Sequence, residues 1–273
     1  MNTSLCANCN NTFSGNYCNQ CGQKAFTYKD KSIHGIIGEA VHFLTHFEGK
    51  IFTTMRMVIT TPGKYSLNYC SGVRQRYYKP ISFFLMLILL YLLFPIMKGM
   101  NQELHFYQSN YLIGDLISSQ IQHKLAETGM SFDQLSEVFA QKSEKTAKLL
   151  LLLLIPLSAG ALYLLFFRRK KPAYDLLTVA TEINIFVLLV FFLILPVFIL
   201  FLIVIFHVPD REELFYPILL TLFAVMLTAN FRRFFGEKLV FCFLKAIMFM
   251  LLYFIISQII YKLSLFELTL LMI

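Results

Sequence analysis

The distribution of apolar residues changes at residue 80, where long runs of Leu, Ile, Val and Phe begin. A helix needs about 20 largely apolar residues to cross the hydrocarbon core of a membrane. By that criterion we expect about five spans, with these approximate bounds: 81–97, 148–167, 182–206, 214–229 and 239–261. Pro156, Pro196 and Pro217 fall inside three of these runs and predict kinks, because neighbouring helices can satisfy the freed backbone groups. The pattern therefore predicts an all-α polytopic membrane protein, with a transmembrane helical domain at residues 80–273.

The segment 99–147, between the first two spans, is too long for a turn and has a helical period. Apolar residues recur on one face at these positions: Leu112, Leu116, Ile117, Ile121 and Leu125. Gly129 can end that helix, and Ser131-x-x-Gln134 is typical of a capping box that starts the next one. We therefore expect an extracytoplasmic helical hairpin. Both a cap over the bundle and a partner-binding surface fit it.

The segment 31–79 precedes the first span and is amphipathic over its first half. Apolar residues recur at helical spacing as far as Val58, which favours a helix or helix pair on the membrane surface or the bundle. His42 and His46 share a helical face and could form a second metal site. The Glu of an H-E-x-x-H pattern is missing, so imidazoles on an interfacial helix are the simpler interpretation. The dipeptide Pro62-Gly63 ends the amphipathic stretch with a turn.

Two C-x2-C pairs, Cys6 with Cys9 and Cys18 with Cys21, lie within residues 1–25. Each pair can form a tight turn that directs two sulfurs at one ion. Disulfides are the alternative, but they require an oxidising compartment, and the charge pattern places this end in the cytosol. So short a segment cannot bury a stable core, and one structural Zn²⁺ would supply its folding energy. Because cysteines fill all four positions, the spacing predicts a structural zinc ribbon.

The positions of Lys and Arg determine the expected orientation. The formal net charge is +8, although only 15% of the residues are charged and 57% are hydrophobic. In membrane chains, basic residues gather at the cytoplasmic ends of spans. They gather here before the first span, in Arg168-Arg169-Lys170-Lys171 after the second, and between the fourth and fifth. The pattern therefore predicts a cytoplasmic N-terminus and a C-terminus outside.

A basic and aromatic stretch leads into the first span. These residues of it can lie at interface depth and contact anionic lipid headgroups: Arg74, Arg76, Tyr77, Tyr78 and Lys79. A simple positive-inside anchor explains the same residues without lipid-specific recognition. Membrane lipids are expected partners under either interpretation.

This junction and the cysteine pairs together resemble a bacterial family of uncharacterised membrane proteins. Its members look like a C-x2-C…C-x2-C-G-Q ribbon, a Pro-Gly turn, a Gly-x-Arg-x-Arg-Tyr stretch and a span headed by proline. The matching residues here are Cys6, Cys9, Cys18, Cys21, Gly22, Gln23, Pro62, Gly63, Tyr69, Gly72, Arg74, Arg76, Tyr77 and Pro80. Val73 stands where the family usually has a basic residue, and the resemblance covers about the first 95 residues. It implies a multi-pass protein of the bacterial cytoplasmic membrane and brings no established activity.

Two ionisable residues lie inside the expected spans, where charge is costly. Glu182 is near the cytoplasmic start of the third span, and Lys245 lies about 10 Å into the fifth. We hypothesise an intramembrane ion pair between Glu182 and Lys245. The alternative, which is the simpler one, is that both side chains reach back to the cytoplasmic interface.

The sequence contains no Ser nucleophile motif, H-E-x-x-H pattern or paired-Asp metal motif. A non-enzymatic membrane protein, whose ribbon docks a cytosolic protein partner or assembles a membrane complex, fits the closed four-cysteine site best. The alternative is a transporter or channel component for a small solute or lipid; five spans are few, which a homo-oligomer could remedy. A lipid-modifying enzyme is least favoured, although scattered residues could form an outer site: His105, His123, His207, Asp115, Asp133 and Asp210. Nucleic acid is not an expected partner, because Met1–Gln23 carries no Lys or Arg.

Overall fold

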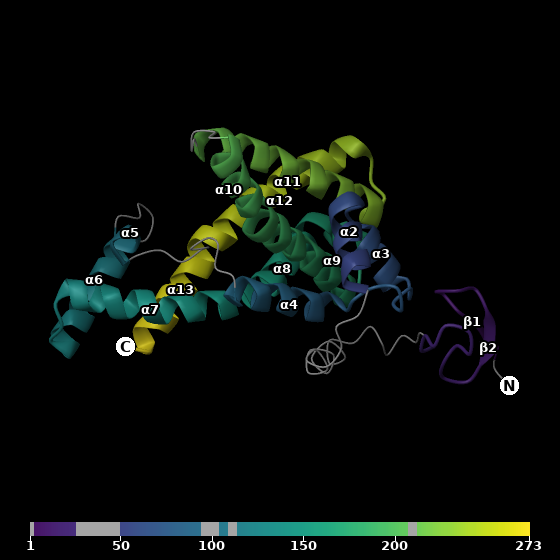
Figure 1. Ribbon diagram of the computed structural model, residues 1–273, viewed down its shortest axis with the longest axis horizontal. Helices are drawn as coiled ribbons and strands as arrows, with labels where there is room; N and C mark the ends of the chain where they lie inside the picture. Colours follow the sequence, from purple (N-terminus) through teal and green to yellow (C-terminus); the bar gives the residue numbers. More distant parts are fainter. Residues whose placement is uncertain (1–2, 26–49, 94–103, 109–113, 207–211) are drawn as a thin grey trace.

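The computed structural model describes residues 3–25, 50–93, 104–108, 114–206 and 212–273 (Figure 1). A small ribbon at the N-terminal end contains the antiparallel strands β1 (Thr3–Leu5) and β2 (Thr12–Ser14), paired with Ser4 opposite Phe13. The remainder is helical. Its α-helices are α2 (Lys50–Thr60), α3 (Lys64–Cys70), α4 (Pro80–Leu93), α5 (Leu104–Gln108), α6 (Gly114–Thr128), α7 (Phe132–Leu150), α8 (Leu154–Phe166), α9 (Ala173–Phe186), α10 (Leu195–Phe206), α11 (Glu212–Phe235), α12 (Leu239–Ile255) and α13 (Lys262–Leu271).

Several of these helices follow one another without a break and form longer continuous helical stretches. Within the described ranges, four helical stretches are long and apolar enough to cross a membrane: Thr146–Arg169, Ala173–Phe201, Pro217–Phe235 and Leu239–Leu271. A shorter apolar helix, Pro80–Tyr91, begins where the first span is expected, and the end of that expected span lies outside the described residues. The chain is therefore built as a multi-pass membrane protein.

The helices differ from the expected spans mainly at their ends. The helical stretch at the third expected span begins at Ala173 rather than near Glu182, and α11 continues to Phe235, beyond Ala229. The last helical stretch continues past the end of the fifth expected span, from Tyr261 to Leu271. These extensions carry polar residues, and a helix continues beyond the apolar stretch when other helices cover it.

None of the three prolines expected to cause kinks ends its helix. Pro156 follows a short 3₁₀ segment, Leu151–Leu153, and Pro196 follows a π-helical segment, Val187–Ile194. Pro217 lies inside α11. The tighter and wider turns change the hydrogen-bond register near a residue that has no N–H to donate.

Helix α9 is at the centre of the molecule. From Tyr174 to Val190 every residue except Leu177 is buried, and α9 packs against α2, α3, α4 and α8. Outward-facing residues of the surrounding helices are apolar and exposed, among them Val197, Val225 and Phe254. Helix α9 carries polar residues in the core, and the outer surface of the bundle is apolar. This arrangement is expected of a protein surrounded by lipid.

A second apolar cluster lies at the end of the molecule opposite the ribbon (Figure 1). Helices α5, α6, α7 and α13 contribute its buried residues: Leu104, Tyr107, Ile117, Ile121, Leu135, Phe139 and Phe266. Helix α6 ends before Gly129, which has a φ of 69°. The predicted capping box is confirmed, since Ser131 and Gln134 exchange side-chain and backbone hydrogen bonds at the start of α7. Helix α13 closes this cluster from the far end of the chain, and the Tyr261 hydroxyl donates to the Ala147 carbonyl at 2.6 Å.

Candidate metal centre and its contact with the bundle

The first cysteine pair lies on a tight backbone knuckle directly after β1. The Cys6 carbonyl accepts from the Asn10 N–H at 2.8 Å, and the Cys6 N–H donates to the Asn11 carbonyl at 2.9 Å. Asn10 has a φ of 57°, a left-handed conformation that Asn adopts more readily than most residues. This turn leaves the sulfurs of Cys6 and Cys9 on one side of the backbone.

The second pair repeats the same knuckle at equivalent positions. The Cys18 carbonyl accepts from the Gly22 N–H at 2.8 Å, and the Cys18 N–H donates to the Gln23 carbonyl at 2.8 Å. Gly22 has a φ of 71° and takes the place of Asn10. Sequence spacing alone predicted both turns, because the hydrogen bonds in each close within five residues.

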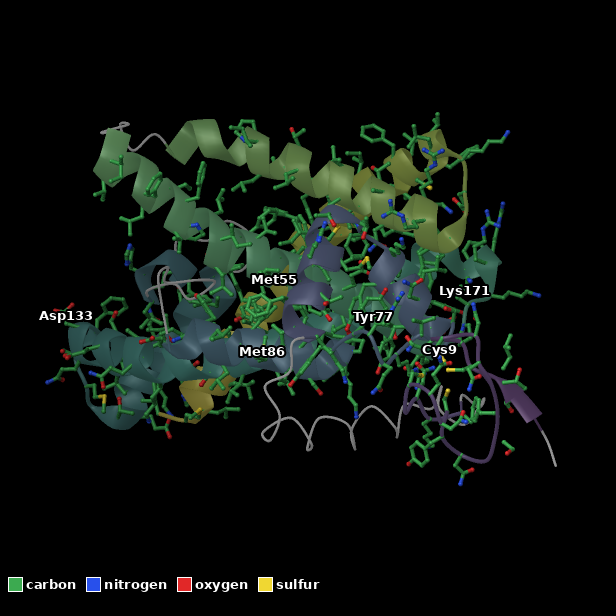
Figure 2. All side chains as sticks on the ribbon, turned by 45° about the vertical axis from the view of Figure 1, so that its right-hand side comes forward. Cys9, Met55, Tyr77, Met86, Asp133 and Lys171 are labelled. Carbon is green, nitrogen blue, oxygen red and sulfur yellow. The ribbon has the colours of Figure 1, made fainter. Side chains whose placement is uncertain are left out.

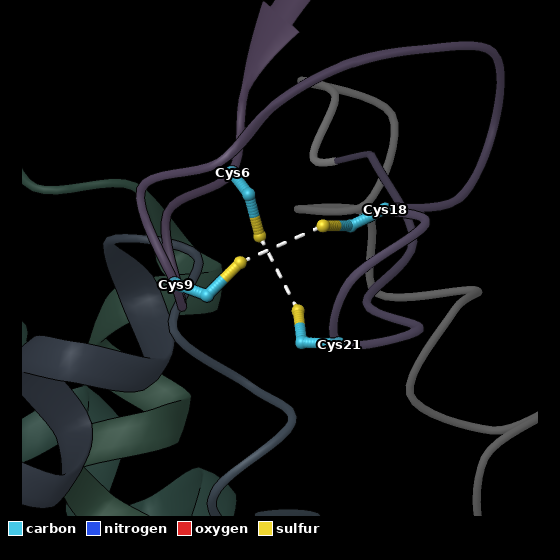
Figure 3. Close-up of side chains that lie close together, drawn as sticks. All are labelled: Cys6, Cys9, Cys18 and Cys21. Atoms are coloured by element: carbon cyan, nitrogen blue, oxygen red, sulfur yellow. Dashed lines mark hydrogen bonds between the residues drawn. The ribbon is translucent and has the colours of Figure 1, made fainter.

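The four cysteine sulfurs converge on one point between the two knuckles (Figure 3). Cys6 Sγ lies 3.5 Å from Cys21 Sγ, and Cys9 Sγ lies 3.6 Å from Cys18 Sγ. All four sulfurs lie within 4.8 Å of one another. These are separate thiols, since a disulfide would bring two sulfurs to about 2.05 Å. A tetrahedral ion with bonds of about 2.3 Å needs sulfurs about 3.8 Å apart, so the four cysteines can hold a metal ion.

The knuckle backbone favours ionised sulfur. Burial alone would raise the pKa of Cys18, but backbone hydrogen bonds at Cys21 and Gln20 outweigh it and lower the pKa to about 6. At Cys9 a backbone hydrogen bond at Asn11 lowers the pKa of the thiol, but desolvation and the three neighbouring cysteines raise it to about 12. Thiolate is the form that binds metals.

Gln23 connects the ribbon to the helical bundle. Its side-chain Nε2 donates to the Gly72 carbonyl, and its Oε1 accepts from the N–H groups of Arg74 at 3.3 Å and Gln75 at 3.2 Å. The side chain is only 6% exposed. One glutamine therefore satisfies three backbone groups of the loop that follows α3.

We expect Gln23→Ala to release this loop without unfolding the knuckle. Each lost hydrogen bond costs about 1 kcal/mol, so deuterium uptake at the Arg74 and Gln75 amides should rise. Gln23→Glu keeps the acceptor oxygens and should protect both amides better than alanine does. Gln20→Ala, at an exposed position, is the matched control. Unchanged uptake at both amides in Gln23→Ala would contradict the contact.

Arg74 is half-buried and lies between two aromatic rings. Its guanidinium carbon lies 5.0 Å from the ring centre of Tyr69 and 5.6 Å from that of Tyr174. Its Nη2 also donates to the Tyr174 hydroxyl at 3.0 Å. The arginine therefore ties the loop to α3 and to the start of α9, where each aromatic face attracts the cation.

The other junction residues divide between buried and exposed positions. Tyr77 is buried, and its hydroxyl accepts from Asn68 Nδ2 at 2.7 Å. Tyr78 is half-buried, and its N–H donates to the hydroxyl of Thr54 at 2.8 Å. Arg76 and Lys79 are exposed. Arg74 and Tyr77 thus have protein partners, which come from α3 and α9.

Glu182 and Lys245 do not form the ion pair that we hypothesised. The fully buried carboxylate of Glu182 accepts from the Gly63 N–H at 2.7 Å and from the Ser66 N–H at 3.0 Å. It therefore caps the first turn of α3, where N–H groups have no partner within the helix. Arg233 approaches the same corner and donates to the Pro62 carbonyl.

Lys245 instead binds a carboxylate that the sequence analysis did not single out. Its Nζ lies 2.8 Å from both side-chain oxygens of Glu237, and Arg169 Nε lies 3.0 Å from the same carboxylate. Burial raises the pKa of Glu237, but the hydrogen bonds and charges of Lys245 and Arg169 outweigh it and lower the pKa. The sequence did contain a signal for this pairing, because Glu237 is an acidic residue in a short basic turn next to a span.

The described part of the structure does not bring the residues of the other two expected sites together, namely the histidine pair and the scattered outer His and Asp residues. His42 and His46 lie outside the described residues, as do His207 and Asp210. Asp133 lies in the first turn of α7, at the opposite end of the molecule from Cys9 and Lys171 (Figure 2). Among the residues that the structure describes, the four cysteines are the group arranged to hold a metal ion.

The fold and this cluster define a multi-pass helical membrane protein with a four-cysteine centre at its N-terminal end. Residues 48–92 match the model of a family described as "Protein of unknown function (DUF3667)". That segment contains α2, α3, the loop that Gln23 binds and all of α4 except its last residue. No curated protein and no solved structure matches the chain.

Proposed function

We propose that the chain is a non-enzymatic membrane protein whose zinc ribbon docks a protein partner. The observation that carries this proposal is the placement of the ribbon. Gln23 fixes one side of it to the bundle, while Leu5 and Tyr17 stand 69% and 63% exposed on it. Large apolar side chains on so small a module favour contact with another protein.

Zinc is the ion that best suits four cysteines arranged tetrahedrally. All four ligands come from the ribbon, which leaves no coordination position for a substrate, so the role is structural. We expect one zinc per chain in the purified protein, and none in Cys18→Ser/Cys21→Ser, by elemental analysis. Cys70→Ala is the matched control, because Cys70 is buried elsewhere. Zinc retained in the double variant would contradict the assignment.

The orientation follows from the basic ends of the spans. Figure 2 shows Lys171, in the basic stretch after α8, at the same end of the molecule as Cys9. Arg232 and Arg233, in the last turn of α11, lie at the helix end that contacts the Pro62 turn. Because positive residues favour the cytoplasmic side, we place the ribbon in the cytosol and the α5–α7 cluster outside, in a bacterial cytoplasmic membrane.

Affinity purification from native membranes tests the docking role. Leu5→Ser/Tyr17→Ser should keep its zinc and lose the partner, whereas Cys18→Ser/Cys21→Ser should lose both. Gln20→Ala serves as a surface control that keeps both. If the same proteins co-purify with every variant, the docking proposal is wrong, and the function should then be sought in the membrane-spanning helices.

A transporter or channel component is the second candidate. Asn184 Nδ2 donates to the Ser158 hydroxyl at 3.1 Å, and the Tyr253 hydroxyl donates to Asn184 Oδ1 at 3.0 Å. Polar groups buried among spans often mark a solute path. The adjoining cavity of about 10 Å³ holds about one water, which favours a packing role. Liposomes containing the protein that flip labelled phospholipid faster than empty ones would favour transport.

A further inference from the structure

A pocket of about 550 Å³ opens where the end of α8 meets the turn between α11 and α12. It lies away from the four cysteines and takes no part in the docking role. Residues from three elements line it, including Arg168, Lys238 and Phe241. These come from the segment after α8, the α11–α12 turn and the first turns of α12.

The pocket is strongly cationic. Arg168, Arg169, Lys238 and Lys245 line it together with one carboxylate, Glu237. Glu237 is already bound to Lys245 and Arg169, and their charges lower its pKa, so it stays ionised near neutral pH. Arg168 and Lys238 have no acidic partner among the described residues. Both are exposed, so they can reach an anion without breaking an existing ion pair.

The remaining walls are apolar and continue onto the outer surface of the bundle. Phe167 and Phe241 line the pocket, and each is 57% exposed. Leu164 on α8 and Leu244 on α12 extend this apolar surface along the same two helices, which pack against each other. A soluble phosphate would leave these residues uncovered, whereas a molecule with a phosphate and an acyl chain would cover both parts.

We propose that this pocket binds an anionic phospholipid of the phosphatidylglycerol type. Arg168 and Lys238 contact the headgroup phosphate by charge-assisted hydrogen bonds. The acyl chain lies along Phe241 and Leu244. Basic pockets at the ends of membrane helices are suited to such headgroups. Glu237 keeps Lys245 and Arg169 in place and limits how tightly the phosphate is held.

The test uses the full chain, purified in detergent and stripped of lipid. Native mass spectrometry would compare phosphatidylglycerol with phosphatidylcholine, and thermal melting would compare phosphatidylglycerol with inorganic phosphate. We expect the anionic lipid alone to bind and to raise the melting temperature. In Arg168→Gln/Lys238→Gln its affinity should fall roughly tenfold or more. Arg232→Gln/Lys170→Gln removes two exposed charges that do not line the pocket, and should bind as the unmodified chain does.

Four outcomes would overturn the proposal. These are equal affinity for phosphatidylcholine, an equal loss in both double variants, stabilisation by inorganic phosphate as large as that by the lipid, and unchanged affinity in Arg168→Gln/Lys238→Gln. Should that variant fail to fold, the affinity of Glu237→Gln for phosphatidylglycerol provides an independent test. It frees Lys245 and Arg169 for the phosphate, so affinity should rise, and weaker binding would contradict the proposal.

Discussion

Gly63→Ala is expected to destabilise the protein far more than the same change at Gly129. Both glycines have left-handed backbone, with φ of 82° and 69°, so both variants incur about 1 kcal/mol of strain. Only at Gly63 does the new methyl group meet other atoms. An ideal Cβ there would lie 2.6 Å from the carbonyl oxygen of Asn230 and 2.9 Å from its Cα. At Gly129 nothing lies within 4 Å.

The neighbour at Gly63 is the backbone of α11, which cannot move aside as a flexible side chain would. Overpacking of this kind costs about 1–3 kcal/mol, in addition to the strain. Thermal melting in detergent should therefore show a fall for Gly63→Ala several times that for Gly129→Ala. Equal falls in the two variants would mean that α3 and α11 are not in contact at this turn.

Glu182→Ala is expected to cost about 3–5 kcal/mol of stability. The change leaves the buried N–H groups of Gly63 and Ser66 without an acceptor, at about 1–3 kcal/mol each. Glu182 is also fully buried, so alanine leaves a space in the core where its side chain was. Glu182→Gln keeps one acceptor oxygen and should fall between alanine and the unmodified chain in melting temperature.

Glu127→Ala is the matched control for this prediction. Glu127 pairs with Lys124 at 3.2 Å near the end of α6, its side chain is 58% exposed, and such surface pairs contribute less than about 1 kcal/mol. If Glu182→Ala melts at the same temperature as Glu127→Ala, Glu182 does not cap α3. Loss of expressed protein for Glu182→Ala but not for Glu182→Gln would support the capping role.

Features that depend on neighbouring residues were predictable from the sequence. The cysteine knuckles and the capping box at Ser131 each close within a few residues, so residue type and spacing are enough to identify them. Apolar runs likewise located the spans. Their ends were less predictable, because α13 continues past Tyr261 only where the cluster around Phe266 covers it.

The partners of charged residues were not predictable. Glu182 was expected to need a cation, and Lys245 lay at a similar depth. The carboxylate of Glu182 accepts hydrogen bonds instead from backbone N–H groups more than one hundred residues away, at Gly63 and Ser66. Composition cannot reveal such partners, because every residue except proline carries the same N–H group. The contact between Arg74 and Tyr174 was not predictable for a similar reason, since Tyr174 comes from a distant helix.

Gln23 belongs to two structures at once, and this has a thermodynamic consequence. Its carbonyl closes the second cysteine knuckle, while its side chain holds the loop at Gly72–Gln75. If an ion stabilises that knuckle, the free energy that the docked loop contributes to ion binding equals the free energy that the ion contributes to docking. Metal affinity and the order of the junction are then two measures of one coupling.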